Sequence, residues 1–139
     1  MADYENEPDA VRTTTDDLAR ALFGNKPALW AHLMEDGQGV QGMALWFLNF
    51  STWQGVHGIY LEDFYVRPMR RGRGYGTLLL AELARICVER GYARLDWSCL
   101  AWNRPSHEYY RARGAVPQLD WVGYRLEAES LAEIAGLGT

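Results

Sequence analysis

A glycine-rich turn between a strand-like run and a helix-like run constrains this 139-residue chain more than any other feature. The run from 59 to 66 is rich in aliphatic and aromatic residues, and the run from 77 to 90 carries apolar residues at helical spacing. Between them lies Arg71-Gly72-Arg73-Gly74-Tyr75-Gly76. The backbone N–H groups of such a turn converge with the unpaired N–H groups at the start of the helix. The stretch therefore predicts an anion site, and its glycines let a phosphate approach the backbone.

The order of residues in this turn separates it from two common phosphate loops. The Walker pattern requires GxxxxGK[ST], but the only lysine of the chain, Lys26, lies far upstream. The dinucleotide fingerprint GxGxxG fails because Thr77 stands where the third glycine is needed. The pattern that remains is RxxGxG, read as Arg71, Gly74 and Gly76, with arginine charge available for phosphate oxygens. On this motif alone, an Arg/Gly-rich surface turn before a helix stays open as an alternative.

Residues on both sides of the turn extend the pattern. The sequence Tyr60-Leu61-Glu62-Asp63-Phe64-Tyr65-Val66-Arg67-Pro68 precedes the turn, and Trp102-Asn103-Arg104-Pro105-Ser106 and Tyr109-Tyr110-Arg111-Ala112-Arg113-Gly114-Ala115 follow it. Over roughly residues 4 to 126 the combination resembles the diamine (spermidine/spermine and thialysine) acetyltransferase branch of the GCN5-related N-acetyltransferase (GNAT) superfamily. The resemblance implies an N-acetyltransferase that moves acetyl from acetyl-CoA to a primary amine of a small molecule, either a diamine or polyamine or a thialysine-like amino acid. The alternative is a non-catalytic acyl-CoA-binding or interaction module of the GNAT fold.

Local signals along the chain predict an α+β fold in a single domain, 1–139. Helices are expected at 16–23, at 77–90 and from Pro105 to near Gly114, and strands at 28–35, 40–50, 57–66, 93–100 and 121–128. The tail from 130 to 139 indicates a loose helical turn and a frayed end. The apolar face of the helix at 77–90 is predicted to consist of Leu78, Leu79, Leu83, Ile86 and Cys87. The resemblance specifies a mixed, mostly antiparallel GNAT-type sheet with flanking helices and one parallel strand pair that splays apart.

The resemblance also bears on assembly. Members of the resembled family begin with an additional strand and helix before the position of Tyr4, and the comparison implies that both are missing from this chain. A missing strand leaves a sheet edge open. We therefore expect a homodimer in which a second chain covers that edge.

The resemblance implies that acetyl-CoA, the co-substrate, is bound at the turn and along the strand before it. The pantetheine arm is expected to enter the gap between the splayed strands and to pair with the main chain of the 59–66 strand. Phe64 and Val66 can serve the hydrophobic core as well, since those contacts use main chain. Asn103 is expected both to cap its helix and to bond the pantetheine. The implied coenzyme-binding residues are Phe64, Tyr65, Val66, Arg71, Gly72, Arg73, Gly74, Tyr75, Gly76, Thr77, Asn103 and Ser106.

Two residues are assigned to proton transfer. An amine with a pKa near ~10.4 is free base in only about one molecule in 2,500 at pH 7, a deficit of roughly 4–5 kcal/mol. Glu62 matches the family's proposed base, and a carboxylate that takes the proton through one water would help to meet that deficit. Tyr110 matches the family's catalytic tyrosine and would act as general acid toward the leaving thiolate. The competing interpretations are a solvated Glu62-Asp63 pair and a tyrosine that only packs.

The substrate is expected to be a cationic amine held by carboxylates and aromatic rings. The resemblance implies that its contacts are Tyr4, Glu5, Trp53, Glu62 and Asp63. Strict alternation along the strand would point Glu62 and Asp63 to opposite faces. Ser51 and Val122 stand where the polyamine enzymes carry acids, so a primary amine such as thialysine is favoured over spermine.

Composition excludes several other classes of protein. A net charge of −4 and a pI near 5.3 argue against nucleic-acid binding, and no run approaches 18 apolar residues, which argues against a membrane protein. Cys87 and Cys99 lie inside apolar runs and indicate buried thiols in a reducing, cytoplasmic compartment. No Cys/His cluster has metal-ligand spacing, so no metal is expected.

Overall fold

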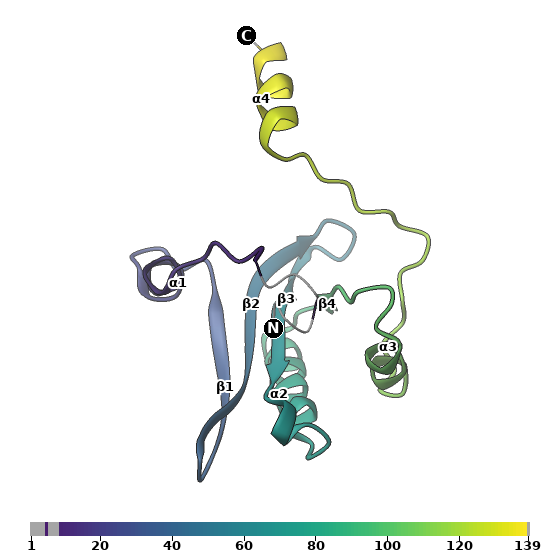
Figure 1. The fold of residues 1–139 in the computed structure, drawn as a ribbon. Coiled ribbons are helices and arrows are strands. Elements are labelled where there is room, and N and C mark those ends of the chain that lie inside the picture. Colours follow the sequence, from purple (N-terminus) through teal and green to yellow (C-terminus); the bar gives the residue numbers. More distant parts are fainter. Residues whose placement is uncertain (1–4, 6–8, 139) are drawn as a thin grey trace. The chain divides into compact units, whose positions relative to one another are not determined.

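The computed structural model describes residue 5 and residues 9–138. The chain divides into two compact units, residues 1–100 and residues 101–139, and each is described by itself. The elements of the first unit (Figure 1) are α1 (Thr15–Phe23), β1 (Trp30–Asp36), β2 (Gly39–Ser51), β3 (Val56–Val66), the 3-10 turn η1 (Pro68–Arg70), α2 (Tyr75–Arg90) and β4 (Leu95–Trp97). The second unit contains α3 (Arg104–Arg111) and α4 (Ala128–Leu137).

The first unit is built on one four-stranded sheet with the order β1-β2-β3-β4. The pairs β1/β2 and β2/β3 are antiparallel, while β3 and β4 are parallel and pair only from Ile59↔Leu95 to Leu61↔Trp97. The predicted α+β architecture, with a mostly antiparallel sheet and one parallel pair, is therefore confirmed. The predicted strand at 93–100 shortens to the three residues of β4.

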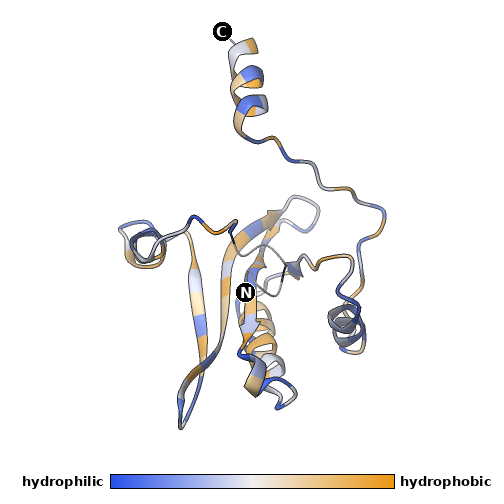
Figure 2. Cartoon of the chain, viewed as in Figure 1, coloured by the Kyte–Doolittle hydropathy of each residue, from blue (hydrophilic) through white to orange (hydrophobic). Residues whose placement is uncertain are grey.

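The core of the first unit lies between the sheet and α2, which packs against all four strands. Figure 2 shows that hydrophobic residues colour much of β2 and of α2. Leu79, Leu83, Ile86 and Cys87 give α2 its buried face, as their helical spacing predicts, but Leu78 is 56% exposed and lies outside that face. The buried cluster consists of Ala44, Trp46, Ile59, Leu61, Leu79, Leu83, Ile86 and Cys87. It fixes the start of α2 against the strand that precedes the glycine-rich turn.

Helix α1 begins and ends where its sequence predicts. Thr14 is the N-cap, its hydroxyl accepts a bond from the N–H of Asp17, and the Asp17 carboxylate accepts one from the N–H of Thr14. This reciprocal capping box satisfies two amides of the first turn. Gly24 follows the last residue of the helix, and the chain then turns into β1.

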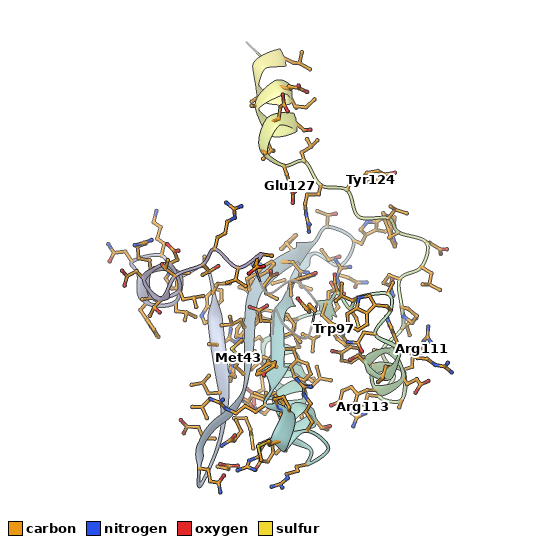
Figure 3. All side chains as sticks on the ribbon, in the orientation of Figure 1. Met43, Trp97, Arg111, Arg113, Tyr124 and Glu127 are labelled. Atoms are coloured by element: carbon orange, nitrogen blue, oxygen red, sulfur yellow. The ribbon has the colours of Figure 1, made fainter. Side chains whose placement is uncertain are left out.

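The second unit corrects two predictions. The segment predicted as a strand at 121–128 is irregular up to residue 127 and joins no ladder within the described residues, because a strand needs a hydrogen-bonded neighbour that the pattern alone does not supply. Tyr124 and Glu127 lie on this segment, as Figure 3 shows. The tail predicted as a loose turn instead forms the regular ten-residue helix α4.

Among the described residues, no helix is both long enough and apolar enough to cross a membrane.

Candidate active site

The glycine-rich turn connects η1 to α2 and has the backbone of an anion-binding loop. Gly72 and Gly74 have φ values of +78° and +82°, in the left-handed region that favours glycine. Gly74 is the N-cap of α2, and its carbonyl accepts the helical hydrogen bond of Leu78 N–H at 3.0 Å. The amide N–H groups that precede Leu78 in the helix therefore lie ahead of the helical ladder. Their direction along the helix axis favours an anion in front of the loop.

The arginines of the turn differ in how they are held. The Nε of Arg71 donates to the carbonyl oxygen of Val66 at 3.0 Å, and its guanidinium carbon lies 5.6 Å from the ring centroid of Tyr65. Arg71 is therefore folded against the end of β3. Arg73 is exposed, and it makes no hydrogen bond or ion pair that the structure records with the residues it describes. One guanidinium is thus fixed beside the loop, while the other lies on its surface.

A bulge in β3 places Glu62 at the centre of the candidate site. Leu61 pairs with Trp46 and Asp63 pairs with Leu45, so Glu62 is one extra residue opposite β2. Bulges re-aim side chains and are frequent beside active sites. Leu61 belongs to the buried cluster, and Phe64 packs against it. The next core-facing residue after Leu61 is therefore Phe64, three positions on, where strict alternation would place it two positions on. Strict alternation therefore fails here, and Glu62 and Asp63 both fall between two core-facing residues.

The parallel strands separate at the same point. Within the described sheet, β4 ends at Trp97, opposite Leu61, and β3 continues alone on that edge as far as Val66. At the fork, the hydroxyl groups of Tyr60 and Ser98 are hydrogen bonded at 2.8 Å. The part of β3 that contains Phe64 to Val66 therefore has one edge paired with β2 and one edge beyond the reach of β4. That edge is suited to main-chain pairing with an extended ligand.

An acidic group surrounds the bulge. Asp63 is half-buried, and its pKa is raised above the ordinary value, first by burial and then by the negative charges of Glu62 and Glu5. The charge of Glu5 also contributes to raising the pKa of the Cys99 thiol, after burial. The charge of Glu5 therefore acts on Asp63 and on Cys99, and its contact with the amine stays a prediction. Tyr4, predicted beside it, lies outside the described residues.

Trp53 is not brought to this group within the chain. It lies in the turn between β2 and β3 and is 90% exposed. Glu62 lies six positions after Val56, the first residue of β3, a length of about 20 Å at the usual rise per residue. The predicted contact of Trp53 with substrate stays a prediction.

The remaining predicted residues belong to the second unit. Asn103 is the N-cap of α3, where its side-chain oxygen accepts the N–H of Ser106 at 3.4 Å, so the predicted cap is present. Tyr110 is half-buried near the end of α3, and its ring makes an edge contact with Tyr109 at 5.5 Å between centroids. The guanidinium of Arg113 lies 3.5 Å from the Tyr109 ring centroid, so this ring packs against the cation. Figure 3 labels Arg111 and Arg113 at the end of this helix.

Sequence reasoning missed Asp36, which borders the glycine-rich turn. Its Oδ2 atom accepts hydrogen bonds from Arg70 Nε and from the Tyr75 hydroxyl, each at 3.0 Å. Arg70 lies immediately before the stretch from 71 to 74, and Tyr75 lies immediately after it. The only sequence signal was an acidic residue at a hairpin turn, which is common on surfaces.

Neither cysteine forms a disulfide, and both thiols have a pKa raised by burial. Within the part of the chain that the structure describes, no three His, Cys, Asp or Glu side chains are grouped so that they could hold a metal ion.

The chain is similar in sequence and in fold to known acetyltransferases. The family model described as "Acetyltransferase (GNAT) family" matches residues 2–115. The chain is 33% identical to the thialysine N-epsilon-acetyltransferase of Bos taurus, over 98% of this chain and 86% of that protein. It is 30% identical to the human spermidine/spermine N(1)-acetyltransferase-like protein 1, over 97% of this chain but 21% of that longer protein. Among solved structures, an integron cassette protein from the mobile metagenome of V. cholerae has a TM-score of 0.79 and 26% identity, over 95% of this chain and 83% of that one.

Proposed function

Because this chain belongs to the GNAT family of acetyltransferases, we propose that it is the N-acetyltransferase that its site chemistry suggests, one that carries acetyl from acetyl-CoA to a primary amine of a small molecule. The observation that carries the proposal is a carboxylate, Glu62, on a bulge where two parallel strands separate, followed along the chain by an anion-binding loop. The chain that carries these features in this order is 33% identical, over nearly its whole length, to a thialysine N-epsilon-acetyltransferase.

The coenzyme is proposed to use the loop and the open edge of β3. The amides at the start of α2 and the charges of Arg71 and Arg73 would bind its diphosphate. The main chain from Phe64 to Val66 would pair with the pantetheine arm, and an amide there would polarise the thioester carbonyl. Asn103 and Ser106, at the start of α3, are proposed to contact the same arm. Gly72 and Gly74 support this assignment because they adopt the left-handed backbone of the turn and, having no Cβ, let a phosphate approach the loop amides.

The proposed reaction forms a C–N bond to the amine and breaks the C–S bond of the thioester. The lone pair of the amine nitrogen attacks the thioester carbon, and the resulting oxyanion is stabilised by a backbone N–H of β3. Before the attack, Glu62 takes one proton of the ammonium form through a water; after the attack, the nitrogen loses its second proton to solvent, and the tetrahedral intermediate expels the thiolate. Tyr110 donates its phenolic proton to the leaving sulfur, so the products are the N-acetyl amine and the free thiol of the coenzyme. Proton exchange with solvent resets both side chains.

The amine is proposed to carry a positive charge away from the reacting nitrogen. The negative charges of Glu62 and Glu5 both act on Asp63, and such an acidic group attracts a cation. Ser51, which replaces an acid of the polyamine enzymes, is buried and accepts the N–H of Gln54 at 3.2 Å, so it serves the β2–β3 turn. With fewer carboxylates available, a thialysine-like amino acid or a short diamine is proposed in preference to spermine.

Assembly and location are part of the same proposal. β1 is at one end of the described strand order, so its outer edge has no neighbour in that sheet, and we propose a homodimer that covers it. The cysteines are free thiols, which supports a reducing, cytoplasmic setting.

A screen of amines for thiol release tests the proposed function. The purified chain is incubated with acetyl-CoA and with thialysine, ornithine, short diamines, spermidine or spermine, and the released thiol is measured with a thiol-reactive dye. We expect amine-dependent release, fastest with a thialysine-like or short diamine substrate. Micromolar binding of the coenzyme by calorimetry with no thiol release for any amine would instead identify the non-catalytic module.

Replacing Tyr110 with phenylalanine should lower kcat at least about tenfold, because the leaving thiolate loses its proton donor. The ring and its contact with Tyr109 are retained, so the folded helix should be unchanged. The matched control is Tyr109→Phe, which removes the neighbouring hydroxyl from a ring that packs under Arg113. Full activity in Tyr110→Phe would show that another group, or water, protonates the sulfur.

A further inference from the structure

The side-chain carboxylate of Asp36 connects the hairpin between β1 and β2 to both sides of the phosphate loop. Its Oδ2 atom accepts from Arg70 Nε and from the Tyr75 hydroxyl at 3.0 Å each. Its Oδ1 atom accepts from the backbone N–H of Gln38 at 2.8 Å and from Gln41 Nε2 at 3.1 Å. Four donors thus converge on one carboxylate, which has no donor of its own when it is ionised.

We propose that Asp36 is a positioning residue that holds the loop from Arg71 to Gly74 in the shape that binds the coenzyme's diphosphate. This inference rests on the proposed function, because it assumes that acetyl-CoA binds at the loop. Asp36 itself would touch neither the coenzyme nor the amine. It would act through Arg70, immediately before the loop, and through Tyr75, the first residue of α2.

The loop needs such a constraint because of its glycines. Gly72 and Gly74 both adopt positive φ values and have the greatest backbone freedom of any residue type. A loop of this composition samples many conformations unless its ends are fixed. Binding then restricts it to one conformation, and the conformational entropy that is lost weakens the affinity. Bonds from one carboxylate to residues on each side of the loop reduce that loss before the ligand arrives.

The hairpin that carries Asp36 is itself fixed to the chain before the loop. The N–H and the Nε of Arg67 donate to the carbonyl oxygens of Gln41 and Val40 at 2.8 and 2.9 Å. Gln41 is the extra residue where the β1/β2 register shifts, and its side chain is buried. The Arg70 guanidinium also donates to the Gln38 side chain. These hydrogen bonds fix the hairpin that carries the Asp36 carboxylate, as a positioning group requires.

The charge of Asp36 is compatible with a neighbouring anion because Arg70 neutralises it. The Arg70 and Asp36 side chains are only 12% and 20% exposed, so the pair is shielded from water. The N–H of Gln38 and the other donors hold the pKa of Asp36 below its ordinary value, which keeps the carboxylate ionised at neutral pH. Arg71 and Arg73 then keep the local charge at the loop positive. An amide at position 36 would direct an NH₂ group at some of these donors.

Kinetics of Asp36→Ala test the inference. We expect the KM for acetyl-CoA, and the Kd for coenzyme A by calorimetry, to rise about tenfold or more, while kcat at saturating coenzyme and the KM for the amine change less than about threefold. Tyr75→Phe removes one bond and keeps the carboxylate, so it should raise the same KM about threefold, and it provides the measurement if Asp36→Ala does not fold. The effects of the two substitutions should be less than additive, because they share one contact.

Asp96→Ala is the matched control. Asp96 is a half-buried carboxylate of the same sheet that pairs with Arg94 at 3.0 Å and accepts from Asn49 at 3.2 Å, without contact to the loop. Asp96→Ala should lower the free energy of unfolding as Asp36→Ala does. It should leave the ratio of the KM for acetyl-CoA to the KM for the amine unchanged. Equal effects of Asp36→Ala and Asp96→Ala on that ratio would overturn the inference, as would wild-type coenzyme affinity in both Asp36→Ala and Tyr75→Phe. A wild-type chain that binds no coenzyme would instead overturn the proposed function, and this inference with it.

Discussion

Replacing Gly74 with alanine should weaken the binding of acetyl-CoA by roughly 30-fold or more, a loss of about 2 kcal/mol, because charge-assisted bonds between loop amides and diphosphate would be displaced. Gly74 has a φ of +82° and is the N-cap of α2. A Cβ built on Gly74 meets no protein atom within 4 Å beyond its chain neighbours, so the free protein has room for it. If a diphosphate lies against the loop amides, the added methyl group competes with it for that space.

The free protein should lose only about 1–2 kcal/mol from this change, which is the usual strain of an L residue in the left-handed region. Gly91 offers a matched control at the other end of the same helix. It is the C-cap of α2, has a φ of +69°, and likewise has open space around its missing Cβ. Gly91→Ala should therefore reproduce the loss of stability without any loss of coenzyme binding.

Two measurements separate these effects. Denaturant unfolding gives the stability of each variant, and calorimetry with coenzyme A gives its Kd. The loop assignment predicts similar unfolding free energies for the two variants and a weakened Kd in Gly74→Ala alone. Wild-type affinity in Gly74→Ala would place the diphosphate away from the start of α2, and the proposed coenzyme site would then be wrong.

The parts of the fold that local signals specify could be predicted from the sequence. The capping box at Thr14, the glycine that ends α2 and the apolar spacing of that helix all act within a few residues of the element they define. The glycines of the turn before α2 are an equally local signal, since the left-handed φ values of Gly72 and Gly74 follow from the residue type. These features therefore appear where the residue pattern predicts them.

Features that depend on distant partners could not be predicted in the same way. The alternating run after Trp121 has strand-like residues, but a strand exists only with a neighbour, and within the described residues that run pairs with none. The role of Asp36 depends on Arg70 and Tyr75, which lie more than 30 positions further along the chain. No local pattern marks such a contact in advance.

The bulge at Glu62 is an instructive intermediate case. Glu62 can be proposed as the base from the sequence, but its surroundings cannot be predicted, because the register shift arises from how β2 and β3 pair. The shift inserts one residue between the core-facing Leu61 and Phe64, so that Glu62 and Asp63 both lie between them, and the charge of Glu62 contributes to the raised pKa of Asp63. A sequence reading that assumes strict alternation assigns those side chains to opposite faces.

Replacing Glu62 with glutamine should lower kcat by roughly 100-fold at neutral pH, because a positioned base is lost while the shape of the side chain is kept. Glu62 is exposed and makes no hydrogen bond or ion pair that the structure records with the residues it describes, so the fold should tolerate the change. The physical reason for the loss is the protonation of the amine, of which only about one molecule in 2,500 is free base at pH 7 for a pKa near 10.4. Without a base, the reaction must rely on that small fraction.

The amine itself provides the sharpest test of this role. For an amine whose pKa lies below the assay pH, the substrate is already free base, and the deficit of Glu62→Gln should shrink several-fold. With an ordinary alkylamine, the rate of the variant should keep rising with pH toward about 10, where the free base becomes abundant. Asp63→Asn should differ by raising the KM of the amine more than it lowers kcat, since a cation contact is lost rather than a base. A deficit of Glu62→Gln that is the same for both amines and at every pH would show that Glu62 orients the substrate and does not accept its proton.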